Sequence, residues 1–120
     1  MKINAGVKKE IISVFDRHIK GGYMLILFGS FADNSATGTS DIDLAVYGVR
    51  KIPRGAFLEL KEELDEKVRT LREIDLVDLT ERGADKALLA NIIRGKIWRK
   101  TKNYQELLKN LKKRSLSIRR

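Results

Sequence analysis

The sequence predicts one α/β (α+β) domain in which a small mixed sheet is flanked by helices. Three observations predict it: a length of 120 residues, a hydrophobic fraction of 42%, and short apolar runs that alternate with segments of helical periodicity. A chain of this length buries roughly two thirds of its unfolded surface, so it folds without cross-links. Strands that alternate with helices along a chain are typical of helices packed against a sheet.

The first half of the chain shows a helix and two strands. Apolar side chains recur at helical spacing from about residue 5 to 20, and the glycine pair at 21–22 ends that helix. The apolar run 23–28 lies between glycines and predicts a buried strand. Residues 29–40 are rich in Gly, Ser, Thr, Asp and Asn, which predicts a turn, a short helix and a loop. Over 41–47, Ile42, Leu44 and Val46 alternate with Asp41, Asp43 and Ala45, which predicts the second strand.

The second half predicts two further strands and three helices. Pro53 suits the first turn of a helix that runs to about residue 70, and the apolar residues of this helix share one face. These apolar residues are Phe57, Leu60, Leu64, Val68 and Leu71. The remaining elements are expected as strands at 73–79 and 96–100 and helices at 84–94 and from Asn103 onward.

Composition excludes several classes of chemistry. The sequence has no cysteine and one histidine, His18, which excludes a disulfide framework, a cysteine nucleophile and a metal site built from thiolates or several histidines. The longest apolar run, Met24–Phe28, is far shorter than the about 20 residues that span a bilayer. The first residues lack the pattern of a secretion signal. We therefore expect a cytoplasmic protein without a membrane segment.

Positive charge is concentrated in the last quarter of the chain. Residues 94–120 carry 11 Lys and Arg and one acid, Glu106, for a net charge of +10, whereas residues 1–93 have a net charge of −1. Such a segment favours an acidic partner, which means nucleic acid, a phosphorylated ligand or an acidic protein face. The alternative is a solvated terminal helix that aids solubility. We expect a domain over residues 1–100 and a basic helical extension of it over 101–120.

Gly29-Ser30 and Asp41-Ile42-Asp43, separated by ten residues, form the candidate chemical centre. Glycine after a strand lets the backbone approach a ligand closely, and the amides of a following helical turn suit a phosphate. Asp41 and Asp43 lie two apart on a strand, so both side chains leave the same face. The two carboxylates repel each other unless a cation lies between them. Mg²⁺ takes oxygen ligands and often bridges protein carboxylates and substrate phosphates. Two-metal phosphoryl or nucleotidyl transfer requires this arrangement.

A third carboxylate is expected on the strand over 73–79, which offers Asp75 and Asp78. The two lie three residues apart and therefore face opposite sides of the sheet. Alternation alone leaves the choice open. Asp75 lies mid-strand among apolar residues, where a carboxylate costs most unless a cation pairs with it, and this favours Asp75 as the third ligand.

Two motifs, Phe-Gly-Ser at residues 28–30 and Ser-Asp-Ile-Asp-Leu at residues 40–44, together resemble the signature of a known family. The family is that of the minimal nucleotidyltransferases in the DNA polymerase beta superfamily. Residues 74–79 resemble the strand that carries its third carboxylate, and residues 92–98 resemble its closing helix, glycine and strand. The resemblance covers about four fifths of the chain.

The resemblance implies a nucleotidyltransferase fold that binds ATP as substrate. It also implies two Mg²⁺ ions, with Mn²⁺ as the alternative metal. It assigns Asp41, Asp43 and Asp75 as catalytic and metal-binding residues, and Gly29 and Ser30 as nucleotide-binding residues.

As a small free-standing member of this family, the chain resembles the antitoxin of a two-gene pair. The partner of such an antitoxin is a helical HEPN protein, usually a ribonuclease toxin. The resemblance implies that the chain transfers AMP from ATP to a hydroxyl of the toxin, expected on a tyrosine, and so silences it. Because the sequence shows no second domain to hold an acceptor, we expect the acceptor site to come from a partner and a small-molecule acceptor to be less favoured.

One departure from the family pattern keeps alternatives open. Members often carry a basic residue just after Gly-Ser, but here no basic residue lies between Lys20 and Arg50. The alternatives are a binding antitoxin with little turnover and a nucleic-acid-binding protein that uses residues 94–120. An edge strand and apolar residues near the C-terminus also suit a homo-oligomer or a mixed complex.

Overall fold

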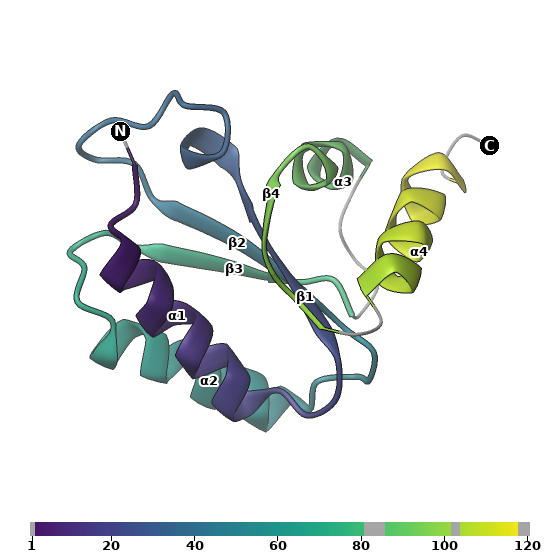
Figure 1. Ribbon diagram of the computed structural model, residues 1–120, viewed down its shortest axis with the longest axis horizontal. Coiled ribbons are helices and arrows are strands. Elements are labelled where there is room, and N and C mark those ends of the chain that lie inside the picture. The colour runs from purple at the N-terminus through teal and green to yellow at the C-terminus, as the bar shows by residue number, and fades with distance from the viewer. Residues whose placement is uncertain (1, 81–85, 102–103, 118–120) are drawn as a thin grey trace.

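The computed structural model describes residues 2–80, 86–101 and 104–117, of which residues 115–117 are described by their backbone alone. In these residues, helices, strands and one short 3₁₀ turn follow each other along the chain (Figure 1). The elements are α1 (Ala5–His18), β1 (Tyr23–Phe28), η1 (Gly29–Phe31), β2 (Ile42–Gly48), α2 (Arg54–Lys67), β3 (Ile74–Asp78), α3 (Lys86–Ile93), β4 (Lys96–Lys100) and α4 (Tyr104–Ser117). None of the helices in this described part is long and apolar enough to cross a membrane.

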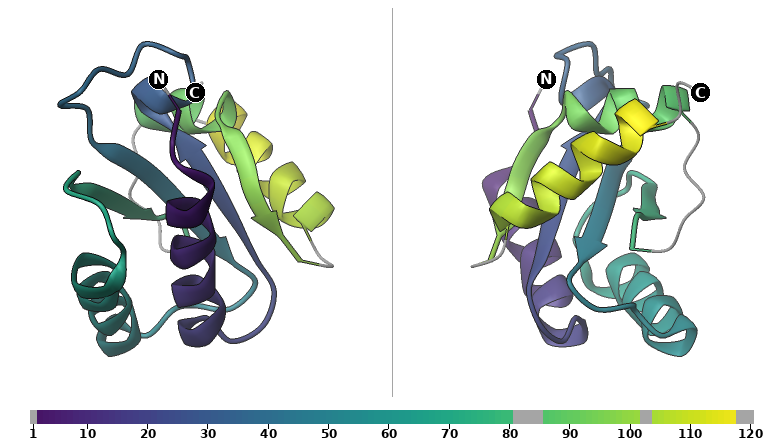
Figure 2. Two further views of the ribbon diagram at one scale, coloured as in Figure 1. Left: turned by 60° about the vertical axis from the view of Figure 1, so that its left-hand side comes forward. Right: turned by 90° about the vertical axis from the view of Figure 1, so that its right-hand side faces the viewer.

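The four strands form one mixed sheet in the order β3-β2-β1-β4. β1 pairs antiparallel with β2 and with β4, and β2 pairs parallel with β3 after a crossover that contains α2. α1 and α2 lie on one face of the sheet, and α3 and α4 lie on the other (Figures 1 and 2). The predicted mixed sheet with flanking helices is therefore confirmed.

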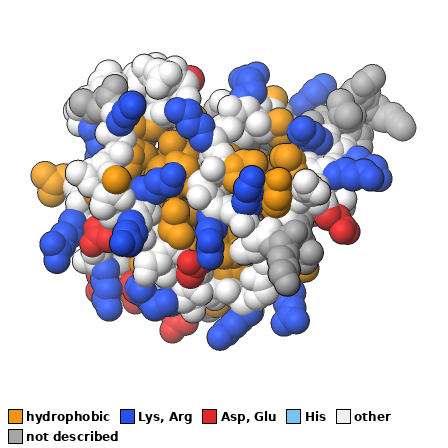
Figure 3. Space-filling model, in the orientation of Figure 1, with side chains coloured by type: hydrophobic (Ala, Val, Ile, Leu, Met, Phe, Trp, Pro, Cys, Tyr) orange, Lys and Arg blue, Asp and Glu red, His pale blue; other side chains and the backbone are white. Residues whose placement is uncertain are grey.

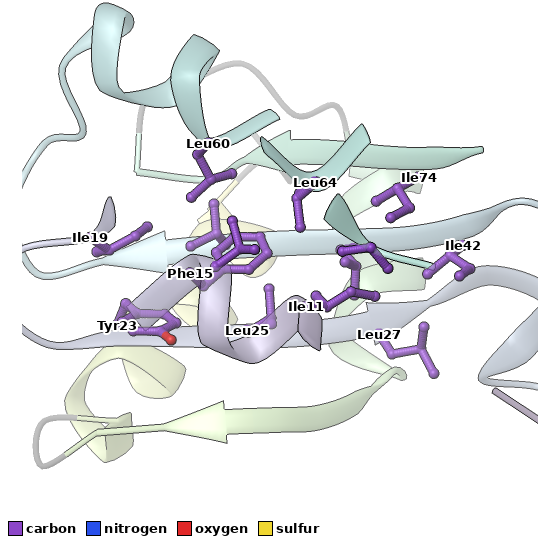
Figure 4. Close-up of a cluster of buried hydrophobic side chains, with 14 of the residues drawn as sticks. Ile11, Phe15, Ile19, Tyr23, Leu25, Leu27, Ile42, Leu60, Leu64 and Ile74 are labelled. Atoms are coloured by element: carbon purple, nitrogen blue, oxygen red, sulfur yellow. The ribbon is translucent and has the colours of Figure 1, made fainter. Parts of the chain in front are cut away.

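β1 is an inner strand, and all of its side chains are buried. Leu25 and Leu27 pack with α1 and α2, whereas Met24 and Ile26 pack with α3 and α4, as the alternation of a strand requires. Figure 4 shows the larger cluster, on the α1–α2 face, where Phe15 packs among aliphatic side chains. Because neither face of β1 meets water, its sequence is an unbroken apolar run.

α1 is fixed at both of its ends. The Asn4 side-chain oxygen accepts the backbone N–H of Gly6 at 2.7 Å and caps the helix. The helix ends ahead of Gly21, whose φ of 83° lies in the left-handed region that favours glycine. Near this end His18 Nε2 lies 2.6 Å from Glu63 Oε1, and the pair joins α1 to α2.

The expected end of α2 is wrong. α2 ends at Lys67 and not near residue 70, because Val68 leaves the helix with an extended backbone (φ −78°, ψ 126°). Leu71 consequently lies beyond the helix and is fully exposed, so it is not part of the apolar face. The short helix expected after β1 is present as the 3₁₀ helix η1.

α4 packs against the domain. Leu107 and Leu111 are buried in the smaller cluster, on the α3–α4 face of the sheet. The starts expected for the last two helices, residues 84–85 and Asn103, lie outside the described residues. α4 thus contributes to the core of the domain as well as to its basic surface.

Candidate functional site

β1 runs into a turn that only glycine fits. Gly29 directly follows β1 and has a φ of 76°, in the left-handed region. A Cβ at this position would collide with the Asp43 carboxylate, so the missing side chain lets the backbone and the carboxylate lie together. Ser30 follows within η1 and is half-buried. The turn thus brings the Gly-Ser motif against the carboxylate of β2.

Asp43 and Asp75 lie side by side, because the parallel register of β2 and β3 pairs them. Both face the α3–α4 side, since Ala45 and Val77, two positions further on, pack in the cluster on that side. Burial, then the negative charges of Asp75 and Asp41 and a hydrogen bond with Asp75, raise the pKa of Asp43 to about 6. A bound cation would therefore stabilise the ionised form of both carboxylates.

The structure distinguishes Asp75 from Asp78. Asp78 pairs in register with Val46, and its carboxylate accepts the backbone N–H of Thr80 at 2.9 Å. Asp75 is exposed and not enclosed by apolar neighbours, so the burial argument for it does not hold. Its position beside Asp43 favours the same choice for a different reason, and its role as third ligand stays a prediction.

The donor chemistry of these residues fits a hard divalent cation. Asp41, Asp43 and Asp75 offer oxygen ligands, the kind that Mg²⁺ prefers. Among the residues that the structure describes, no three acidic or histidine side chains converge in a complete metal-binding group. The arrangement is an open carboxylate pair with Asp41 exposed just ahead of β2. An ion that is shared with substrate phosphates takes the rest of its ligands from substrate and water.

Arg72, between α2 and β3, is a residue near the site that sequence reasoning missed. Its Nη1 donates to the carbonyl oxygens of Thr37 and Ser40, at 3.0 and 2.7 Å. Its Cζ lies 4.8 Å from the centre of the Phe31 ring. The segment between the two motifs has no basic residue of its own, and the fold brings one to it from elsewhere. No local signal identifies Arg72, because its contacts depend on the pairing of β3 with β2.

Several basic side chains near the C-terminus lie against the domain's own aromatic rings. Lys100 Nζ is 4.3 Å from the centre of the Tyr104 ring, and Arg114 Cζ is 5.8 Å from that of Tyr47. Arg114 also donates to the Leu79 carbonyl oxygen at 2.6 Å, which ties α4 to the end of β3. On the face in Figure 3, Lys and Arg side chains are spread over the surface and not gathered in one patch.

Nucleotidyltransferases are the class of protein that this sheet, its Gly-Ser turn and its carboxylate pair indicate. The sequence matches the family model described as polymerase beta, nucleotidyltransferase, over residues 9–112, and the chain belongs to this family. The match spans both motifs and all four strands of the sheet. The family and fold expected from the motifs are therefore confirmed. No curated protein gives a significant match to the sequence.

Several solved structures similar to this chain are toxin–antitoxin structures. One, a toxin–antitoxin crystal structure with AMP-PNP, is 26% identical with a TM-score of 0.73, and covers 92% of this chain and 88% of that chain. The MntA-HepT toxin–antitoxin crystal structure is 26% identical with a TM-score of 0.66, at 93% and 83% coverage. A third contains tri-AMPylated Shewanella oneidensis HEPN toxin in complex with MNT antitoxin, and is 25% identical with a TM-score of 0.68, at 93% and 86% coverage.

Proposed function

We propose that this chain transfers AMP from ATP to a hydroxyl of a HEPN toxin, expected on a tyrosine, and acts as the antitoxin of that pair. The observation that carries the proposal is the Asp43–Asp75 carboxylate pair beside the Gly29 turn. Two similar structures support the choice of substrates, because one contains AMP-PNP and another contains a tri-AMPylated HEPN toxin.

Each residue of the site has a role in the proposed reaction. The Gly29 backbone and the Ser30 hydroxyl orient the terminal phosphates of ATP. Asp41 and Asp43 would hold two Mg²⁺ ions and Asp75 would join one of them, with Mn²⁺ as the alternative metal. These ions would supply charge neutralisation and a lower pKa of the attacking hydroxyl.

The transfer step exchanges one bond at the α-phosphorus of ATP for another. The acceptor hydroxyl oxygen bonds to the α-phosphorus while the bond to the oxygen that bridges toward the β-phosphate breaks. Pyrophosphate leaves with the electron pair, and Asp75 accepts the proton of the hydroxyl. Asp75 is the exposed member of the carboxylate pair, which suits a base that a large protein acceptor must reach.

The intact mass of a HEPN partner, incubated with this chain, ATP and Mg²⁺, tests the proposal. We expect a gain of one or more AMP units. Asp43→Asn removes charge from the pair and should slow transfer on the order of 100- to 1,000-fold. Asp65→Asn changes an exposed aspartate on α2 that pairs with Lys61, and should keep the wild-type rate. Transfer by Asp43→Asn at the wild-type rate would contradict the assignment.

A binding antitoxin with little turnover is the second candidate. The observation that favours it is the segment after Ser30, which contains Asp33 and has no basic residue before Arg50. In that case the HEPN partner co-elutes with both the wild-type chain and Asp43→Asn, and its mass does not change in the presence of ATP and Mg²⁺. Size-exclusion chromatography combined with mass measurement separates the two candidates.

Nucleic-acid binding through residues 94–120 is the third candidate, and the net charge of +10 favours it. Contact with several phosphates makes the affinity for a single-stranded RNA fall steeply between about 50 and 200 mM salt. A fluorescence-anisotropy titration at these two salt concentrations measures this dependence. Absence of binding at the lower concentration would remove this candidate.

A further inference from the structure

The Arg72 side chain connects the segments that carry the candidate site. Phe31, beneath its guanidinium, directly follows the Gly-Ser motif. Ser40, whose carbonyl oxygen it binds, directly precedes the Asp-x-Asp motif. Arg72 itself stands three residues before Asp75 in the chain. One side chain is thus coupled to the phosphate-facing turn and to both carboxylate-bearing strands.

Arg72 is itself held in a defined place. Its backbone N–H donates to Thr70 Oγ1 at 3.1 Å, which fixes the start of the side chain. At the other end, Nη1 is shared between the Thr37 and Ser40 carbonyl oxygens. The Phe31 ring that its guanidinium faces is 4% exposed and belongs to the larger cluster, so the ring is a fixed surface. The contact therefore fastens a polar segment to the core.

In the segment over residues 32–41, Ala32 and Ala36 pack against the larger cluster, whereas residues 37–39 and 41 are exposed. The described hydrogen bonds of this segment are mostly local, as where Asp33 Oδ1 accepts the backbone N–H of Ser35 at 3.0 Å. Pairing with the neighbouring strand begins only at Ile42, whose N–H donates to the Glu73 carbonyl oxygen at 2.9 Å. Exposed segments with few buried apolar contacts open at low free-energy cost. A charged clamp on the carbonyl groups of Thr37 and Ser40 consequently orders the exposed part of this segment, which follows Ala36.

We propose that Arg72 is a positioning residue for AMP transfer, which holds the segment between the two motifs so that Asp41 and the Gly-Ser turn are aligned with Asp43 and Asp75. The inference rests on the proposed function, and it assigns Arg72 no contact with the nucleotide. Arginine suits the task because its planar guanidinium donates in a fixed geometry and stacks on a ring. Lysine at the same position keeps the charge and a donor but loses the flat contact with Phe31.

The test compares Arg72→Met and Arg72→Lys with a matched control, Arg69→Met. Arg69 lies three residues earlier, and its side chain is 91% exposed. Steady-state AMP transfer to the HEPN partner is measured as kcat and KM for ATP, and hydrogen exchange is measured at the amides of residues 37–42. Arg72→Met should lower kcat about 10- to 100-fold with KM for ATP within about threefold, because misplacement of the site by about 1 Å costs this much.

The two other variants sharpen the result. Arg72→Lys should give an intermediate kcat, above that of Arg72→Met and below that of the wild type, and Arg69→Met should match wild type. Exchange over residues 37–42 should rise about tenfold in Arg72→Met and remain unchanged in Arg69→Met. If Arg72→Met does not fold, Arg72→Lys decides: an intermediate kcat with raised exchange supports the clamp, and wild-type values for both overturn it.

Two results would overturn the inference in a folded Arg72→Met protein. One is a kcat within twofold of wild type with unchanged exchange over residues 37–42. The other is a KM for ATP raised more than tenfold at constant kcat, which would mean that the guanidinium binds the nucleotide. If the wild-type chain transfers no AMP at all, the proposed function fails, and the exchange comparison alone then supports or overturns the clamp.

Discussion

The two faces of the sheet differ in what covers them. On the α1–α2 face, alternate residues of β2 (Ile42, Leu44 and Val46) are buried in one large apolar cluster with both helices. On the opposite face, β2 presents Asp43 and Ala45, and α3 and α4 lie over β1 rather than over β3 (Figure 1). The same strand thus stabilises the fold with one face and carries the candidate chemistry on the other.

This difference teaches how a short chain keeps a charged site without losing its core. Burying a carboxylate and placing it beside others destabilises a folded protein, and burial first, then the charges of Asp75 and Asp41, raises the pKa of Asp43. The cost of these carboxylates is confined to the side of the sheet opposite α1 and α2, on which Asp43 and Asp75 lie and which we call the open face. The α1–α2 side, which we call the closed face, supplies apolar burial. Substitutions on the two faces should therefore separate stability from activity.

The largest effect on stability is expected on the closed face. Phe15 is fully buried and stacks on Tyr23 at 6.3 Å between ring centres, so Phe15→Ala should lower the free energy of unfolding by about 3–5 kcal/mol. Urea denaturation measures the loss. Leu58→Ala, at an exposed position of α2, is the control and should change it by less than about 0.5 kcal/mol. If the folded fraction of Phe15→Ala also loses AMP transfer, the faces are not separable.

A smaller loss of stability is expected at Gly29, together with misalignment of the Gly-Ser turn and the Asp43 carboxylate. Gly29→Ala forces a side chain into the left-handed region and against the Asp43 carboxylate. We expect a cost of about 1–3 kcal/mol and strongly reduced AMP transfer. Gly38→Ala is the control, because a Cβ there meets nothing within 4 Å. A Gly29→Ala protein that equals the Gly38→Ala control in thermal unfolding and transfer rate would refute this view of the turn.

The smallest effect on stability is expected at Asp43, on the open face, where a substitution stabilises the fold instead of destabilising it. The pKa of Asp43 is about 6 in the folded chain against 3.8 for an ordinary aspartate, so the folded state binds more protons between these values. Stability therefore falls as pH rises from about 4 to about 6, by less than about 1 kcal/mol because the carboxylate is half-exposed. Asp43→Asn should abolish this fall and raise the melting temperature at pH 7.5 without metal. Parallel pH profiles of wild type and Asp43→Asn would show no effect of Asp43.

The strands and the Gly-Ser and Asp-x-Asp motifs are readable from sequence for physical reasons. β1 is buried on both faces and appears as an unbroken apolar run, while β2 alternates Ile42, Leu44 and Val46 with Asp43 and Ala45 because its faces differ. Gly29 is indicated by its place between strand and polar loop, and the structure supplies the reason, a carboxylate where its Cβ would lie. The local sequence pattern is sufficient to predict a feature wherever a single strand or a single turn determines which residues can stand there.

Other features depend on pairing between segments and have no local signal. Alternation could not choose between Asp75 and Asp78, and the register with β2 is what places Asp75 beside Asp43. Arg72 reaches the segment before β2 only because β3 lies next to it. The end of α2 at Lys67 was missed because apolar periodicity continues to Leu71 although the backbone has already left the helix.

The strand order determines how far apart in the sequence the paired strands lie. Met24 of β1 pairs with Lys100 of β4, near the other end of the chain, and such closure costs more loop entropy than pairing between neighbours. Gly29, Asp43 and Asp75 are instead brought together by β1–β2 and β2–β3, which are successive strands. The candidate site is thus formed by pairing between successive strands of the sheet, and none of these three residues lies on β4.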